Sequence, residues 1–286
     1  MFASPLLMTV SLAMAPITEL PTLFWGIAPE VATTDVANVR TKHDRAVVLV
    51  HGLLPRVFHP VRAEKPEAHE WQASSGSLVK QLADDFDVYG FSYGQTQSVD
   101  SVAMSRGLRN GISNLKDAGY KEIVLVGHSA GGVIVREFAE MFPDSGITKV
   151  VTVAGPHLGS FWAKLPNFTL PKSQVPFIQS MLPETREART KRATVELKKD
   201  LEFCCVLCRT ARTDNDTVVS LRSQWPDDLQ EQGVSAVLVG CTHFDAMTSE
   251  APINAIVEVV RGKVVRWKPE QIEDARRVLF GEIKKK

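Results

Sequence analysis

The chain has 286 residues, of which 33 are basic and 33 acidic, and its pI is about 7.1. This length fits one large α/β domain with a substantial core. The balanced charge gives no global basic field of the kind that gathers nucleic acid, so no nucleic-acid partner is expected. The three lysines at 284–286 are interpreted as a solvated tail.

The N-terminal segment, residues 1–45, is predicted to be a lead-in to the main domain. Residues 1–16 are apolar and end in a small-residue pattern similar to a secretory leader, but the basic n-region is missing. The run is too short to span a bilayer. We therefore expect a cytoplasmic protein without a membrane span, with secretion through a weak leader as the alternative. Residues 17–41 have no clear period, and either a short antiparallel edge or a lead-in fits them.

Beyond the lead-in, apolar runs and amphipathic stretches alternate along the chain. The run 46–50 is uninterrupted, as expected of a central parallel strand covered on both faces. One helix over 102–115 would start at Asp100 or Ser101 and stop at Gly119. The expected strands are 46–50, 86–91, 122–126, 149–154, 201–209 and 234–240, and the expected helices are 77–82, 102–115, 133–141, 251–260 and 268–283. This order predicts an α/β fold with a mostly parallel sheet and helices on both faces.

The main domain is predicted to span residues 46–265, followed by a C-terminal helix and basic tail at 266–286. A long connection at about 161–200 interrupts the alternation. Its first part, 161–182, mixes bulky apolar side chains with three prolines. Long connections at the carboxyl edge of a sheet are usually functional when they are ordered, which predicts a cap or lid insertion.

Four cysteines do not make a disulfide framework in a chain of this size. Three of them, Cys204, Cys205 and Cys208, fall in one expected strand, where Cys205 faces away from the other two. No metal site is therefore expected from them. A pairing of Cys208 with Cys241, on the next strand, is conceivable, but free buried thiols in a reducing compartment are favoured.

The sequence Gly127-His128-Ser129-Ala130-Gly131 has the pattern G-x-S-x-G between an expected strand and an expected helix. Such a turn holds the serine in a strained conformation that only small neighbours permit, and it projects the hydroxyl above the sheet edge. The N–H of Ala130, at the helix N-terminus, would point at the oxygen that becomes negative during acyl transfer. Ser129 is therefore predicted to be a nucleophile.

A second oxyanion donor is expected in His51-Gly52-Leu53, directly after the strand 46–50. The glycine frees the backbone to turn an N–H, that of Leu53, toward the serine. His51 is expected to pack below the site; the alternative is a catalytic base or a metal ligand. The turn 155–160 caps the strand that follows the serine and is expected to line the acyl pocket. The residues predicted to border the substrate are His51, Gly52, His128, His157 and Leu158.

A serine hydroxyl at its normal pKa needs an adjacent base, which in turn needs a group to orient it. His243 follows the last expected strand and is the one histidine after the candidate acids. Asp214 and Asp216 share the loop after the preceding strand, and either could reach the imidazole. Asp216 is preferred, because residues 217–219 would pack back on the sheet and fix it.

Taken together, these motifs resemble those of the α/β-hydrolase superfamily, and within it of lipases and esterases. The resemblance covers about residues 46–262 and rests on 50–53, 127–132, 155–160, 215–219 and 243–245. It implies a triad of Ser129, Asp216 and His243, an oxyanion hole built from the amides of Leu53 and Ala130, and no cofactor.

The sequence therefore predicts a serine hydrolase that cleaves carboxylic esters, either small molecules or lipids, with an apolar acyl group. A thioesterase, an amidase or an acyltransferase could use the same residues. Serine at this position argues against a dehalogenase or an epoxide hydrolase. The alternative of another class is a non-catalytic ligand-binding protein that uses a pocket under 161–182.

Overall fold

The computed structural model describes residues 19–27, 42–54, 60–164, 171–192 and 196–281. The leader-like residues and the basic tail lie outside this part of the chain, so the predictions made for them stay predictions. Within the described residues, no helix combines the length and apolar character that a membrane span needs.

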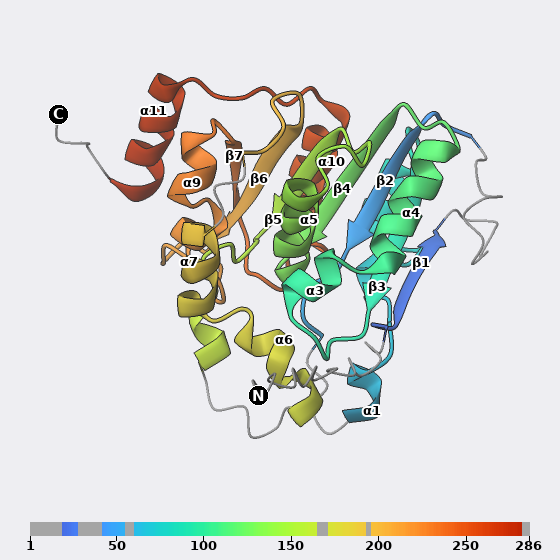
Figure 1. Cartoon of the computed structure of the whole chain (residues 1–286). Helices are drawn as coiled ribbons and strands as arrows, with labels where there is room; N and C mark the ends of the chain where they lie inside the picture. The colour runs from blue at the N-terminus through green and yellow to red at the C-terminus, as the bar shows by residue number, and fades with distance from the viewer. Residues whose placement is uncertain (1–18, 28–41, 55–59, 165–170, 193–195, 282–286) are drawn as a thin grey trace, which may run out of the picture.

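One seven-stranded sheet forms the centre of the molecule (Figure 1). Its strand order is β1-β3-β2-β4-β5-β6-β7, and every neighbouring pair is parallel except β1 with β3. The strands are β1 (Thr22–Gly26), β2 (Arg45–Val50), β3 (Asp87–Tyr93), β4 (Glu122–His128), β5 (Lys149–Val153), β6 (Glu202–Arg209) and β7 (Ser235–Gly240). The predicted parallel sheet is thus confirmed, and β1 supplies the short antiparallel edge that was one of two expectations for residues 17–41.

Helices cover both faces of this sheet, as Figure 1 shows with α3, α4 and α5 in front and α10 behind. One apolar core lies under α3, α4 and α5, and a second lies under α2 and α10. The helices are α1 (Pro60–Ala63), α2 (Ser77–Leu82), α3 (Val99–Ala103), α4 (Arg106–Asp117), α5 (Ala130–Met141), α6 (Val175–Gln179), α7 (Pro183–Arg192), α8 (Leu221–Gln224), α9 (Asp227–Glu231), α10 (Glu250–Arg261) and α11 (Pro269–Phe280), with 3₁₀ helices η2 (Glu70–Gln72), η3 (Phe161–Lys164) and η4 (Lys172–Gln174).

The single helix expected over 102–115 is wrong: the segment forms α3 and α4, with a break between them. Ser98 caps α3, and Ser105 starts α4 by accepting a hydrogen bond from the N–H of Leu108. The glycines that weaken this helix have a packing role. A Cβ on Gly107 would lie 1.9 Å from Thr22 Oγ1, and one on Gly111 would lie 2.2 Å from Phe24 Cδ2. Glycine therefore lets α4 approach β1 closely.

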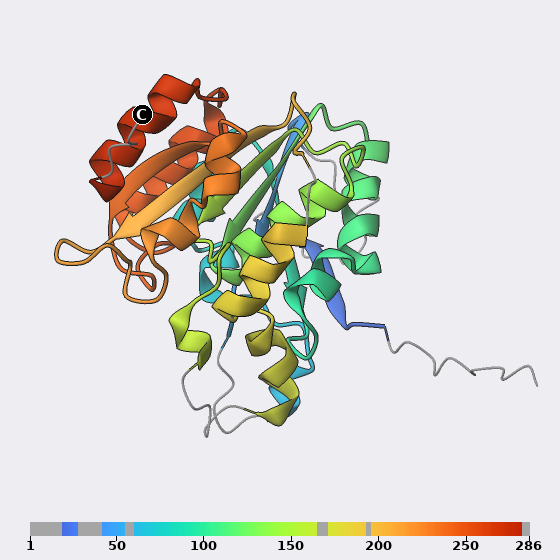
Figure 2. The ribbon, with the colours of Figure 1, turned by 60° about the vertical axis from the view of Figure 1, so that its left-hand side comes forward.

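The connection from β5 to β6 contains η3, η4, α6 and α7. Figure 1 places α6 beyond the carboxyl ends of the parallel strands, and Figure 2 shows α7, in yellow, beside α5. Buried ion pairs hold α7 there. Glu137 of α5 binds Arg186 Nη2 and Arg189 Nη2 at 2.5 Å each, and only 2% of its side chain is exposed. The C-terminal part of the connection is thus fixed to the helix that follows Ser129.

Replacing Glu137 by glutamine is expected to lower the free energy of unfolding by about 2 kcal/mol, because the buried Arg186 loses its nearest carboxylate. Asp100, at 3.4 Å, remains as a weaker partner. Denaturant unfolding followed by circular dichroism measures the change. The matched control is Glu184→Gln in the exposed pair with Lys164, where no measurable change is expected. Equal stability of the two variants would contradict the assignment of Glu137 as the anchor of α7.

Candidate active site

Ser129 lies in the turn between β4 and α5, with φ of 55° and ψ of −128°. This left-handed conformation is rare for a residue with a side chain and persists only where the surroundings enforce it. The flanking glycines permit it: a Cβ on Gly127 would lie 2.3 Å from Gly131 O, and one on Gly131 would lie 2.3 Å from Val50 O. The sequence thus folds locally as the G-x-S-x-G pattern predicts, with a strand before the turn and a helix after it.

His243 joins Ser129 to Asp216. Its Nε2 lies 2.9 Å from Ser129 Oγ, and its Nδ1 lies 2.7 Å from Asp216 Oδ2. The three residues follow β4, β6 and β7, whose carboxyl ends meet at one edge of the sheet. A carboxylate accepts, so Nδ1 carries the proton and Nε2 is left free to accept from the serine hydroxyl.

A tight turn holds Asp216 in this position. Its side chain is fully buried, and its Oδ1 accepts hydrogen bonds from the N–H groups of Val218 (2.9 Å) and Val219 (2.7 Å). The backbone carbonyl of Asp216 accepts from the N–H of His243 at 2.7 Å. Asp214 is exposed and does not contact the imidazole. The structure therefore brings Asp216, of the two candidates, to the histidine.

The loop His51-Gly52-Leu53 lies against Ser129. A Cβ added to Gly52 would lie 2.6 Å from Ser129 Cβ and 2.9 Å from His128 O. In the described part of the chain, the N–H groups of Leu53 and Ala130 donate to no protein acceptor. Ala130 lies at the N-terminus of a twelve-residue helix, and Leu53 directly follows Gly52, so these two amides remain the candidates for stabilising a developing oxyanion.

Replacing Gly52 by alanine is expected to lower kcat by about 10²-fold, because the added methyl displaces Ser129 or the loop that carries the Leu53 amide. Steady-state kinetics measure the effect. Gly240→Ala is the matched control, since a Cβ there meets nothing within 4 Å. Unchanged kcat in a correctly folded Gly52→Ala variant would contradict the prediction that the Leu53 amide is an oxyanion donor.

The residues expected to border the substrate differ in how far their side chains are buried. His51 is buried and stacks on Tyr93, with ring centroids 4.6 Å apart, so it packs below the site as expected. His157 is buried and lies 3.3 Å from Thr152 Oγ1, whereas Leu158 is half-buried. None of the hydrogen bonds of His157 within the described residues reaches Ser129 or His243.

His128 contacts the backbone of the histidine loop. Its Nε2 lies 3.2 Å from His243 O, and because a carbonyl can only accept, Nε2 carries the proton. Burial, with the neighbouring His243 ring as the second cause, holds the pKa of His128 well below its usual range. The neutral His128 ring thus donates to the loop that presents His243.

Several residues near the site have no motif in the sequence. Gln95 Nε2 donates to Gly52 O at 3.0 Å, and its Oε1 accepts from the N–H of Leu54 at 3.0 Å. Gln174 Nε2 also donates to Gln95 Oε1. The indole of Trp162 donates to Thr217 O at 2.9 Å, next to Asp216. The position of Gln95 just after β3, at the carboxyl edge, could have indicated a role near the site. Gln174 and Trp162 fall in the predicted cap or lid connection, but no pattern singles them out within it.

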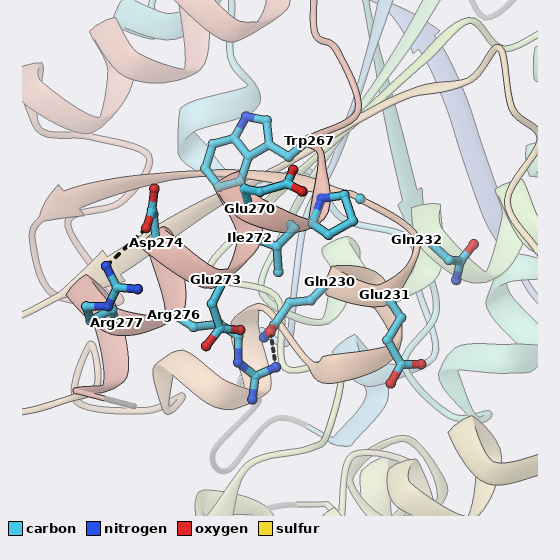
Figure 3. Close-up of a pocket in the computed structure, with 12 residues that line it drawn as sticks. Gln230, Glu231, Gln232, Trp267, Glu270, Ile272, Glu273, Asp274, Arg276 and Arg277 are labelled. Atoms are coloured by element: carbon cyan, nitrogen blue, oxygen red, sulfur yellow. Dashed lines mark hydrogen bonds and ion pairs between the residues drawn. The ribbon is translucent and has the colours of Figure 1, made fainter. Parts of the chain in front are cut away.

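A cavity of about 820 Å³ lies between α9 and α11 (Figure 3). It is lined by Gly233, Trp267 and Ile272, among others. Gly233 precedes β7, so this cavity opens at the amino ends of the strands, whereas Ser129 follows the carboxyl end of β4. The cavity is therefore separate from the candidate active site.

The model of the alpha/beta hydrolase family matches residues 47–262 of the sequence. The chain belongs to the alpha/beta hydrolase family. The matched segment contains Ser129, Asp216 and His243, together with the loops that carry them. Comparison with curated protein sequences gives no match for this alpha/beta hydrolase.

Solved structures of lipases and esterases resemble this alpha/beta hydrolase in fold. The mature form of the lipase BlEst2 from Bacillus licheniformis has a TM-score of 0.59 at 13% identity, over 78% of this chain and 94% of that one. Phospholipase PlaB from Legionella pneumophila has a TM-score of 0.56 at 13% identity, over 78% and 60%. The metagenomic carboxyl esterase MGS0156 has a TM-score of 0.51 at 16% identity, over 91% and 83%. At these identities the likeness is one of fold.

Proposed function

We propose that this alpha/beta hydrolase cleaves carboxylic esters with an apolar acyl group through a Ser129 acyl-enzyme. The observation that carries the proposal is the chain of hydrogen bonds from Ser129 Oγ through the His243 ring to the buried Asp216 carboxylate. A nucleophile bonded to a base, and that base bonded to an orienting acid, is the arrangement that activates a serine hydroxyl.

In the proposed reaction, His243 Nε2 takes the proton of Ser129 as the hydroxyl oxygen attacks the ester carbonyl carbon. The N–H groups of Leu53 and Ala130 then stabilise the oxyanion. Asp216 keeps the imidazole in the productive tautomer and stabilises the imidazolium. His243 returns the proton to the leaving alcohol, and water, activated by the same nitrogen, releases the acyl group.

Exposed aromatic side chains near these residues support an apolar acyl group. Phe244, which follows His243 directly, is 72% exposed, and Phe161 and Trp162 are 73% and 54% exposed. Trp162 is tied to the Asp216 turn through Thr217 O. Exposed apolar surface of this kind is typical of places where an apolar ligand or surface binds. The lipase, esterase and phospholipase names of the structural neighbours agree with an ester substrate.

A panel of p-nitrophenyl esters of graded acyl length tests this proposal. We expect hydrolysis with kcat/KM rising from the acetate to medium chains, because each methylene transferred from water to an apolar site contributes about 0.8 kcal/mol at most. A p-nitroanilide and a thioester of the same acyl group distinguish an amidase and a thioesterase. Preference for the shortest ester, with no response to emulsified substrate, would make the protein a plain esterase. No turnover of any ester by the folded protein would contradict the proposal.

A further inference from the structure

Cys208 and Cys241 lie side by side at the carboxyl ends of β6 and β7. Cys208 is opposite Val239 in the parallel register, and the N–H of Cys241 donates to Arg209 O at 3.1 Å. Side chains alternate along a strand, so Cys241, two residues after Val239, faces the same side as Cys208. Each thiol shifts the pKa of the other, which agrees with this placement on one face.

The two thiols differ in how an oxidant could reach them. Cys208 is fully buried, whereas Cys241 is half-buried and lines a surface cavity of about 450 Å³ together with Thr210 and Thr242. A small molecule in this cavity would meet Cys241 first, with Cys208 directly behind it.

Cys241 is also the more acidic thiol of the pair. The neighbouring Cys208 thiol lowers the pKa of Cys241, whereas Cys241 and burial raise the pKa of Cys208. Burial and the carboxylates of Asp216 and Asp245 act in the opposite direction on Cys241, but the effect of Cys208 is larger. The thiolate is the form that reacts with oxidants.

The other two cysteines provide internal controls. Cys204 and Cys205 are consecutive residues of β6 and face opposite sides of the strand, so they cannot bridge each other. Burial raises the pKa of Cys204 to about 11 and that of Cys205 to about 12. Both thiols are therefore expected to resist oxidation in the folded protein.

We propose that Cys208 and Cys241 form a dithiol site that a hydroperoxide oxidises reversibly to a disulfide. The Cys241 thiolate attacks one peroxide oxygen, the O–O bond breaks, and the departing hydroxide or alkoxide takes a proton from water, leaving a sulfenic acid. The Cys208 sulfur then attacks the Cys241 sulfur; the S–O bond breaks, and water leaves with the proton of Cys208. The dithiol loses two electrons, and the peroxide gains them.

Cys241 lies at an edge of the sheet. It comes directly after the last residue of β7, which is the outer strand and pairs with β6. The site also adjoins both loops of the candidate active site. Cys241 is two residues before His243, and Gln224 bonds both to the backbone of Cys208 and to Val219 O. The proposal nevertheless does not depend on the proposed esterase activity.

Mass spectrometry of the folded wild-type protein treated with hydrogen peroxide tests the proposal. The expected product has lost two hydrogen atoms, carries a Cys208–Cys241 crosslink in its peptide map, and regains both thiols on reduction. A disulfide between other cysteines, a Cys241 sulfenic acid that persists in the wild type, or four unreacted thiols would each overturn it. The readout needs no enzyme activity, so it fails or succeeds independently of the proposed function.

Single substitutions separate the two steps. In Cys208→Ser, which keeps a hydroxyl donor beside Cys241, we expect a Cys241 sulfenic acid that dimedone traps, because the resolving thiol is missing. In Cys241→Ser, Cys208 should stay reduced. Cys205→Ser is the matched control and should form the disulfide as the wild type does. Dimedone labelling of Cys208 in Cys241→Ser, at the rate at which Cys241 is labelled in Cys208→Ser, would contradict the assignment of Cys241 as the thiol that meets the oxidant.

Discussion

Replacing Ser129 by alanine is expected to lower kcat for p-nitrophenyl ester hydrolysis by about 10⁵-fold. In the wild-type protein, Ser129 Oγ lies 2.9 Å from His243 Nε2. Without this hydroxyl, the imidazole has no nucleophile to deprotonate. The proposed oxyanion donors, the amides of Leu53 and Ala130, and the apolar surface remain. A small acceleration over the uncatalysed reaction is therefore still expected. Alanine keeps the Cβ of serine, so the backbone conformation at residue 129 and the fold should be unchanged, which a thermal unfolding curve checks.

A fluorophosphonate probe makes this prediction specific to the residue. The folded wild-type protein should gain one label, located at Ser129 by peptide mapping, and Ser129→Ala should gain none. Ser113→Ala, at an exposed serine on α4, is the matched control and should label as the wild type does. Absence of labelling in the folded wild type would favour the ligand-binding alternative over an enzyme.

Asp216→Asn is expected to lower kcat by about 10⁴-fold, whereas Asp214→Asn should change it by less than about twofold. In Asp216→Asn, the amide oxygen can still accept from the N–H groups of Val218 and Val219. The amide nitrogen would then face His243 Nδ1 and donate to it. The imidazole proton then moves to Nε2, and this nitrogen can no longer accept the proton of Ser129.

Steady-state kinetics of the two asparagine variants, with unfolding curves as a check on folding, distinguish these residues. The comparison is matched because both substitutions remove one negative charge from the same loop. Asp214 is exposed, so its charge is screened by solvent. A larger loss in Asp214→Asn than in Asp216→Asn would move the orienting acid to Asp214.

Much of the fold follows from local patterns in the sequence. Uninterrupted apolar runs predict the parallel strands, because strands covered on both faces have no polar alternation. The lead-in 17–41 had too little periodicity for a choice between an edge strand and irregular structure. β1 forms there because its residues 22–26 pair with β3 and pack under α4, which are contacts made across the chain.

The wrong prediction of one helix over 102–115 also arises because contacts made across the chain are not visible in the local pattern. Spacing of apolar residues is similar on both sides of Ser105, so the pattern reads as one helix. The break depends on where each half must pack, with α3 against α5 and α4 against β1. The glycines that lower helix propensity in α4 are the residues that allow this approach.

The sequence by itself determined the strand-turn-helix that presents Ser129, because the conformation of a tight turn depends on the size of the residues within it and next to it. It also predicted that Ser129, Asp216 and His243 follow three different strands of a parallel sheet, in that order. Only the tertiary structure decided that Asp216, and not Asp214, reaches His243, since the two differ by two residues in one loop and their separation depends on the hydrogen bonds of that turn. The tertiary structure likewise decided that Gln95 donates a hydrogen bond to Gly52 O and that Cys208 lies next to Cys241. Both contacts depend on the register of neighbouring strands, a long-range property that local sequence does not encode.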